Sequence, residues 1–222
     1  MIRGTAGNSN VKMASRFAYA AGITGILANL FLIALYIQLG LQAGGPEGKA
    51  PLGLAGELVG QANDLVGSLA TGFMIPVALA LGGRLPRRWA ARITQAAGLT
   101  AMALLTAGGP LLVLEVLAFA VQTPIAVVAY IVLSLWMFLI NLWSLRTAAL
   151  LPRVARFGVF AGAGTLAGYV IVGLGLLLPW MSWPQLVVFG VGLLLGLPAW
   201  LSIPVWFLLL GRNLGKSLLC SQ

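Results

Sequence analysis

Five polar side chains recur at helical spacing inside a long apolar stretch of the sequence. They are Glu57, Gln61, Asp64, Ser68 and Thr71, and successive members are three or four residues apart. At about 100° per residue, this spacing places all five on one stripe roughly 80° wide. A carboxylate that faces hydrocarbon is costly in free energy, so the stripe must face protein, water or the lipid boundary. The pattern predicts a polar seam on one helix of a membrane protein.

The acidic residues of the chain limit what such a seam could do. They are few: Glu47, Glu57, Asp64 and Glu115. We expect an outward-facing acidic vestibule built from Glu57, Gln61 and Asp64, which Glu115 could join. Such a site would hold a cation, a cationic solute or a proton. In the alternative reading, Glu57 lies among lipid headgroups and Asp64 is hydrogen-bonded inside the bundle.

Other chemistry is excluded by the residues that are missing. The sequence has no histidine and one cysteine, Cys220, so histidine-ligated metals, Ser-His catalysis and an internal disulfide are ruled out. The run GAGTLAG at 162–168 resembles a dinucleotide fingerprint, but it lies in an apolar segment with no strand before it. We therefore expect no enzyme activity, no metal and no cofactor.

The composition indicates that the seam lies within a membrane protein. Of the 222 residues, 60% are hydrophobic and only 8% are charged, whereas a soluble domain has about 25% charged residues. The mean hydropathy of +1.02 agrees with this. The net charge of +9 comes from basic residues in short gaps between apolar runs, a pattern that sets membrane orientation and does not indicate nucleic-acid binding.

The apolar runs predict an all-α, polytopic bundle of six transmembrane helices in a single domain. Residues 110–121 either continue a kinked third helix, which we favour, or turn back as a re-entrant piece. The tails are residues 1–16, which we expect to be disordered, and residues 211–222. The expected spans are 17–41, 53–81, 91–121 with a kink at 108–110, 125–145, 157–178 and 186–210.

The basic residues predict the orientation of these six spans. If both termini are cytoplasmic, all Lys and Arg except Lys49 lie on the cytoplasmic side, as the positive-inside rule requires. One cytoplasmic loop carries a cluster that we expect to contact anionic lipid. This cluster consists of Arg84, Arg87, Arg88 and Arg92.

Small residues predict close contacts between helices, because packing in lipid depends on close backbone approach. Gly53, Gly56, Gly60 and Gly67 lie beside the polar stripe, so a neighbouring helix could approach closely there. Further glycines occur in pairs four residues apart, and they would pack the last two helices together or form a homodimer interface. They are Gly158, Gly162, Gly164, Gly168, Gly192 and Gly196. Prolines inside helices predict hinges at Pro76, Pro198 and Pro204.

The segment Pro204 to Arg212, PVWFLLLGR, and the six-span layout resemble small bacterial integral membrane proteins of unknown function. The resemblance implies a bacterial cytoplasmic membrane and no particular activity. We expect the protein to bind or pass a small cationic or protonated solute through the seam. The alternative is a structural or regulatory subunit that packs against another membrane protein, with the seam joining helices.

Overall fold

The computed structural model describes residues 4–43, 54–84, 88–175, 177–179 and 182–219. This part of the chain is all-α and contains six helices, each long and apolar enough to cross a membrane. Their bounds are α1 Gly4–Ala43, α2 Leu54–Gly82, α3 Trp89–Val113, α4 Phe119–Thr147, α5 Pro152–Gly175 and α6 Trp183–Leu219.

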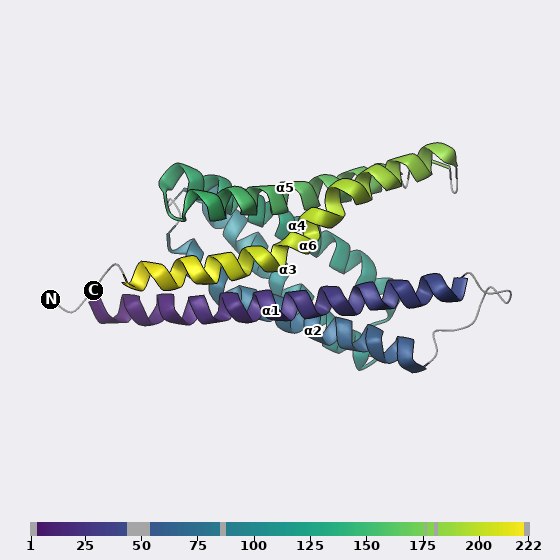
Figure 1. Ribbon diagram of the computed structural model, residues 1–222, viewed down its shortest axis with the longest axis horizontal. Coiled ribbons are helices and arrows are strands. Elements are labelled where there is room, and N and C mark those ends of the chain that lie inside the picture. The colour runs from purple at the N-terminus through teal and green to yellow at the C-terminus, as the bar shows by residue number, and fades with distance from the viewer. Residues whose placement is uncertain (1–3, 44–53, 85–87, 176, 180–181, 220–222) are drawn as a thin grey trace.

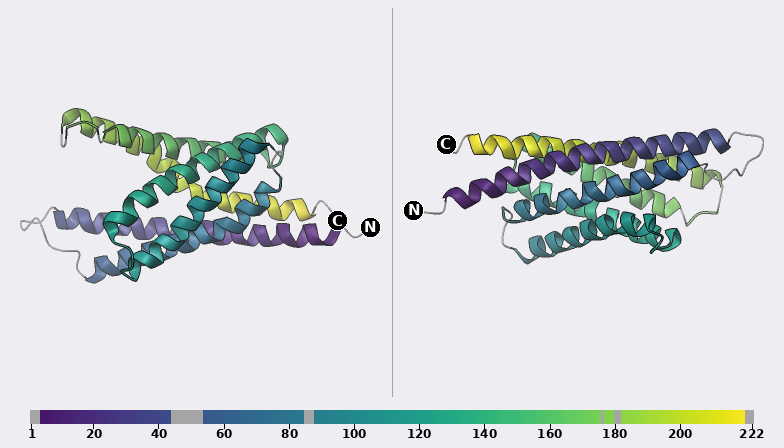
Figure 2. Two further views of the ribbon diagram at one scale, coloured as in Figure 1. Left: turned by 180° about the vertical axis from the view of Figure 1, so that it is seen from behind. Right: turned by 90° about the horizontal axis from the view of Figure 1, so that it is seen from below.

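The six helices form a closed ring. Each helix packs against its neighbours in the chain, and α6 returns to pack against α1. The start of α1 and the end of α6 therefore lie at the same end of the bundle (Figures 1 and 2). We call this the basic end, because the described Lys and Arg side chains are there: Lys12, Arg16, Arg84, Arg88, Arg92, Arg146, Arg153, Arg156 and Arg212. We call the opposite end, with Glu57 and Glu115, the acidic end.

Both chain ends are more helical than the sequence pattern predicts. Helix α1 begins at Gly4, so most of the expected disordered tail is part of the first helix. Helix α6 continues to Leu219, well into the expected C-terminal tail. Ser15 shows how these extensions are held, because its hydroxyl donates a hydrogen bond of 2.8 Å to the carbonyl oxygen of Gly211. The extra turns of the two helices thus support each other.

The expectation of a third helix that continues to residue 121 is wrong. Helix α3 runs through Gly108, Gly109 and Pro110 and ends at Val113, and α4 begins at Phe119. The N–H groups of Val116 and Glu115 bond to the carbonyls of Leu111 and Leu112. This is the Schellman pattern that closes a helix, with Glu115 at φ 58° in the position that usually holds glycine. The chain therefore turns at 114–118 and is not re-entrant.

The core is concentrated toward the basic end. Trp136 of α4 and Trp206 of α6 are almost fully buried, with 1% and 0% of their surface exposed. The Trp136 indole N–H donates to Gln95 Oε1 at 3.1 Å, and Gln95 Nε2 donates to the carbonyl of Ala78 at 2.6 Å. The Trp206 indole N–H donates to the carbonyl of Val154 at 3.1 Å. These tryptophans therefore fill the interior and also hold consecutive helices of the chain together.

The predicted packing glycines lie at contacts between α4, α5 and α6. A Cβ on Gly158 would meet the Asn141 side chain, and one on Gly162 would meet the α4 backbone at Phe138. A Cβ on Gly164 would lie 2.5 Å from Ala199 Cβ. Gly168 faces Gly196 directly, and Gly192 faces Val172. These six glycines join helices of one chain, so they do not form an exposed face for a second copy.

The three predicted hinge prolines are all inside helices. Pro76 lies in α2, and Pro198 and Pro204 lie in α6. Helix α6 changes direction along its length, and its first half diverges from α1 toward the acidic end (Figure 1). Pro204 is buried against α1, where a Cβ on Gly25 would lie 2.9 Å from its ring. Each proline removes one helical hydrogen bond, which accounts for a bend of α6 in this region.

Candidate functional site

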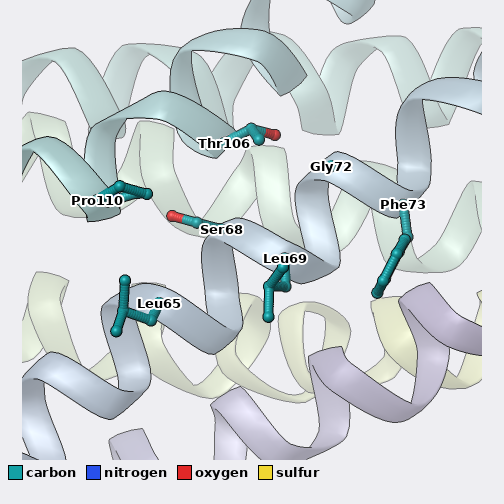
Figure 3. Close-up of a pocket in the computed structure, with 7 residues that line it drawn as sticks. All are labelled: Leu65, Ser68, Leu69, Gly72, Phe73, Thr106 and Pro110. Atoms are coloured by element: carbon teal, nitrogen blue, oxygen red, sulfur yellow. The ribbon is translucent and has the colours of Figure 1, made fainter.

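The polar stripe predicted on α2 is divided between two environments. Glu57 and Gln61 are exposed near the acidic end, whereas Ser68 and Thr71 are buried against α3. The Ser68 hydroxyl donates to the carbonyl of Leu105 at 3.1 Å, and Thr71 Oγ1 lies 3.1 Å from Thr106 Oγ1. Ser68 points toward α3 in Figure 3. This half of the stripe therefore joins two helices, as the alternative reading of the sequence predicted.

Helices α2 and α3 come close together at Gly109. A Cβ on Gly109 would meet both the Ser68 hydroxyl and the backbone carbonyl of Asp64. Glycine is needed here because any side chain would push the two helices apart. The contact explains why the Gly108-Gly109-Pro110 segment stays within α3: it is a packing surface for α2.

The four glycines beside the stripe differ: Gly56 is buried, Gly53 lies outside the described residues, and the expected approach of a helix is wrong at Gly60 and Gly67. A Cβ at either position would meet nothing within 4 Å. Both lie on the face of α2 that also carries Thr71, Met74 and Ala78, at intervals of three, four or seven residues. Thr71, Met74 and Ala78 are buried, with at most 5% of their surface exposed. We call this face the inward stripe of α2; toward the basic end it is packed, and at Gly67 and Gly60 it meets open space.

Asp64 lies on the inward stripe, between Gly60 and Gly67. It is half-buried, in contrast to the exposed Glu57 and Gln61. Tyr130 of α4 interacts electrostatically with Asp64 and also with Tyr169 of α5. Tyr169 in turn interacts with Tyr36 of α1. Asp64 and Tyr130 therefore lie within electrostatic reach of each other, although α2 and α4 do not pack together.

The inward direction of Tyr130 follows from the burial of its neighbours. Leu133, Met137, Ile140 and Ser144 share its face of α4, and each has at most 3% of its surface exposed. Tyr169 shares a face of α5 with Gly162 and Gly158, which pack against α4. Both tyrosines therefore extend the packed interior toward the acidic end.

Two buried polar atoms lie along the same contact of α4 with α5. Within the described residues, Thr165 Oγ1 and Asn141 Oδ1 are buried without a hydrogen-bond partner. Other threonines in the chain, such as Thr24 and Thr106, donate to the carbonyl one turn earlier. Thr165 lies one turn from Tyr169 on α5, so an unused hydroxyl lies next to the tyrosine group.

Glu115 is not brought into this group. It occupies the α3–α4 turn with an exposed side chain, and no ion pair or hydrogen bond of that side chain occurs in the described part of the chain. Glu115 lies there because it is the left-handed residue at which α3 ends. Of the residues predicted for the vestibule, Asp64 alone combines partial burial with an inward direction.

The tyrosines were missed by the sequence reasoning. Tyrosine in an apolar run is compatible with the lipid boundary as well as with the interior, and the run itself does not show which face is inward. One signal was available: Tyr130, Met137 and Ser144 recur at seven-residue spacing, a possible inward face.

The predicted lipid-contacting arginines lie at the basic end. Arg88 and Arg92 are exposed, and Arg84 is half-buried. Arg87 lies outside the described residues. The acidic side chains that the structure describes are at the acidic end or, for Asp64, nearer the middle, so these guanidinium groups face no carboxylate among the described residues. They are free to meet external anions.

The other concave feature on α2 is of a different kind. A groove of about 480 Å³ lies between α2 and α3 and is lined by Leu65, Ser68, Leu69, Gly72, Phe73, Thr106 and Pro110. Leu65 and Leu69 are 40% and 54% exposed, and Leu69 points away from Thr106 and Pro110 (Figure 3). The groove therefore opens on the outside of the bundle, where acyl chains would fill it.

The chemistry available at Asp64 is the binding of one positive charge. A single carboxylate with aromatic rings and hydroxyl groups suits a monovalent cation or a proton. No group of three His, Cys, Asp or Glu suited to a metal ion occurs among the described residues. Comparison of the chain with protein-family models, curated proteins and solved structures gives no match.

Proposed function

We propose that this protein is an integral membrane protein that binds, and passes, a small monovalent cation or cationic solute at Asp64. The observation that carries the proposal is the inward stripe of α2, on which a half-buried carboxylate lies between two glycines that face open space. In a membrane, such a carboxylate requires a positive partner, a proton or water. The protein would bind and move its solute without transforming it.

The distribution of charge supports a cationic ligand. The described Lys and Arg side chains are at the basic end, and the carboxylates lie toward the other end. The potential near Asp64 is therefore negative and would attract cations and repel anions. By the positive-inside rule, the basic end would face the cytoplasm, and the site would then open to the outside of a bacterial cell. The arginines would bind anionic lipid there.

A second candidate is a subunit of a larger membrane assembly. The hydrogen bonds of Ser68 and Thr71 to α3 favour it, because they join helices within the polar stripe. The glycines of α5 disfavour it as a homodimer, since they are already used within the chain. A partner would have to use a different face.

The test is an electrical measurement on purified protein in liposomes of zwitterionic lipid. Rapid addition of tetramethylammonium should produce a saturable current if the cation binds inside the membrane field. We expect Asp64→Asn and Asp64→Ala to abolish this current, because the negative charge is lost. Glu57→Gln removes an exposed carboxylate of the same helix and should leave the current unchanged.

Two outcomes would contradict the proposal. In the first, tetramethylammonium gives the same current with the wild-type protein as with empty liposomes. In the second, the Asp64 variants fold and retain the wild-type current. The subunit reading would then be preferred, and co-purification from native membranes would be the next measurement.

A further inference from the structure

The groove between α2 and α3 lies on the outside of the ring of helices. Leu69, one of its lining residues, is two positions from Thr71 of the inward stripe, so their side chains point in nearly opposite directions around α2. Thr71 is buried, whereas Leu69 is 54% exposed. Gly72 leaves room between the two helices, because a Cβ there would meet only the Thr106 side chain (Figure 3). The groove of about 480 Å³ therefore faces the surrounding lipid.

Two arginines lie toward the basic end on the same face of α3 as the groove. Arg92 is 18 residues before Pro110, and 18 residues are five turns of an α-helix, so the two side chains leave α3 in the same direction. Arg88 is the N-cap residue of α3, about one turn before Arg92. Both arginines are exposed. Between Arg92 and the groove, this face carries only apolar side chains that are exposed or half-buried: Ala96, Leu99 and Ala103.

The arginines and the groove are separated by slightly more than the depth of one lipid leaflet. Phe73 and Arg84 are 11 residues apart, which corresponds to about 16 Å along α2. Arg92 and Thr106 are 14 residues apart, or about 21 Å along α3. The hydrocarbon of one leaflet is about 15 Å deep, and the headgroup lies above it. An acyl chain whose headgroup meets the arginines can therefore end in the groove.

The charges favour a lipid from the leaflet at the basic end. The guanidinium groups there face no carboxylate among the described residues, and such groups bind phosphate through paired N–H donors. At the other end of the hairpin, Glu57 precedes the groove on α2 and Glu115 follows it after α3, and both side chains are exposed. These carboxylates would repel an anionic headgroup. An anionic lipid therefore reaches the groove from the side of the arginines.

We propose that the α2–α3 hairpin binds one anionic phospholipid. Its phosphate lies at Arg84, Arg88 and Arg92, and the end of one acyl chain lies in the groove between Gly72 and Thr106. The site is on the opposite side of α2 from the inward stripe, so this proposal does not depend on the proposed cation function.

The headgroup is tested by native mass spectrometry of the purified, delipidated protein in detergent micelles. Dioleoylphosphatidylglycerol should bind at least about tenfold more tightly than dioleoylphosphatidylcholine, because each arginine attracts the anionic headgroup. The double substitution Arg88→Gln with Arg92→Gln should remove most of this preference.

The acyl chain is tested by filling the groove. Gly72→Leu should weaken the binding of dioleoylphosphatidylglycerol on the order of fivefold, because the chain end loses its contacts with α2 and α3. Dioctanoylphosphatidylglycerol should be unaffected, since its short chains end before the groove. Gly190→Leu on α6 is the matched control, because a Cβ at Gly190 meets nothing within 4 Å and Gly190 does not line the groove. Leu69→Ala changes the groove at an exposed position without disturbing the helix contact, and it should weaken dioleoylphosphatidylglycerol binding about twofold.

Three outcomes would overturn the proposal. The first is equal affinity of the wild-type protein for the two dioleoyl lipids. The second is a preference for phosphatidylglycerol that Gly72→Leu and Leu69→Ala leave at the level of Gly190→Leu, which would place the headgroup at the arginines with no chain in the groove. The third is a wild-type dimer in the same spectra that Gly72→Leu abolishes, which would assign the groove to a second copy of the chain.

Discussion

The two halves of this bundle are made from the same six helices, yet they are packed very differently. Toward the basic end, the ring is filled by Trp136, Trp206 and their neighbours, and the inward stripe of α2 is buried at Met74 and Ala78. Toward the acidic end, the same stripe carries Gly67, Asp64 and Gly60, and a Cβ on either glycine would meet nothing within 4 Å. The comparison shows that one half can supply stability while the other keeps room for a charged group.

Removal of a core tryptophan should give the largest difference between the halves. Trp136→Ala deletes a buried indole and its hydrogen bond to Gln95, and we expect a loss of about 3–5 kcal/mol in unfolding free energy. Trp183→Ala at the acidic end removes a side chain that is 76% exposed and should cost less than about 0.5 kcal/mol. Unfolding in micelles measures both; similar losses would contradict the division into two halves.

Glycine-to-alanine substitutions should change stability in opposite directions in the two halves. Gly98→Ala places a methyl group against the Trp136 ring and should destabilise the protein by about 1–3 kcal/mol. Gly67→Ala adds the same group where nothing lies within 4 Å, so it should be neutral or stabilising by up to about 1 kcal/mol. Melting temperatures of the two variants provide the comparison. A destabilised Gly67→Ala protein would mean that the acidic half is closely packed.

A substitution of Glu115 in the α3–α4 turn should separate the structural role of this residue from any role in cation binding. Glu115 holds a left-handed conformation that favours glycine, so Glu115→Gly should stabilise the protein by about 1 kcal/mol. The cation response should stay at the wild-type level, because the exposed side chain lies apart from the Asp64 group. Loss of the cation response in a stable variant would show that Glu115 takes part in cation binding.

The smallest effect is expected within the polar stripe itself. Ser68→Ala removes one buried hydrogen bond between α2 and α3 and should cost about 0.6 kcal/mol, the usual size for such bonds in membranes. Gln61→Ala, at an exposed position of the same stripe, should not change unfolding measurably. Equal effects at the two positions would show that the stripe is not divided as described.

The sequence predicts the large features of this fold because lipid imposes them. Six apolar runs of spanning length and the separation of Arg from Glu and Asp can both be recognised without a structure. The end of α3 could not be predicted. Gly109 and Pro110 are typical of a helix break, but here Gly109 is the contact for α2, and the break occurs at a glutamate in a left-handed conformation.

The candidate site could be predicted only in part, because some of its residues are set by the rotation of the helices. Asp64 is identified by the free-energy cost of a carboxylate in lipid, which holds whatever its neighbours are. Tyr130 lies near Asp64 only because of how α4 is rotated, and the sequence does not show which apolar face of a membrane helix points inward. Of the glycines predicted to admit a helix, Gly60 and Gly67 instead leave space.

The most direct test is to compare solvent access at two positions on the inward stripe of α2. In a Cys220→Ser background, Gly67→Cys and Ala78→Cys place a thiol on the same face, three helical turns apart. We predict that the cationic reagent aminoethyl methanethiosulfonate modifies the cysteine at position 67 rapidly and the one at position 78 hardly at all. Equal modification of both, or none at position 67 in folded protein, would contradict an open acidic half above a closed basic half.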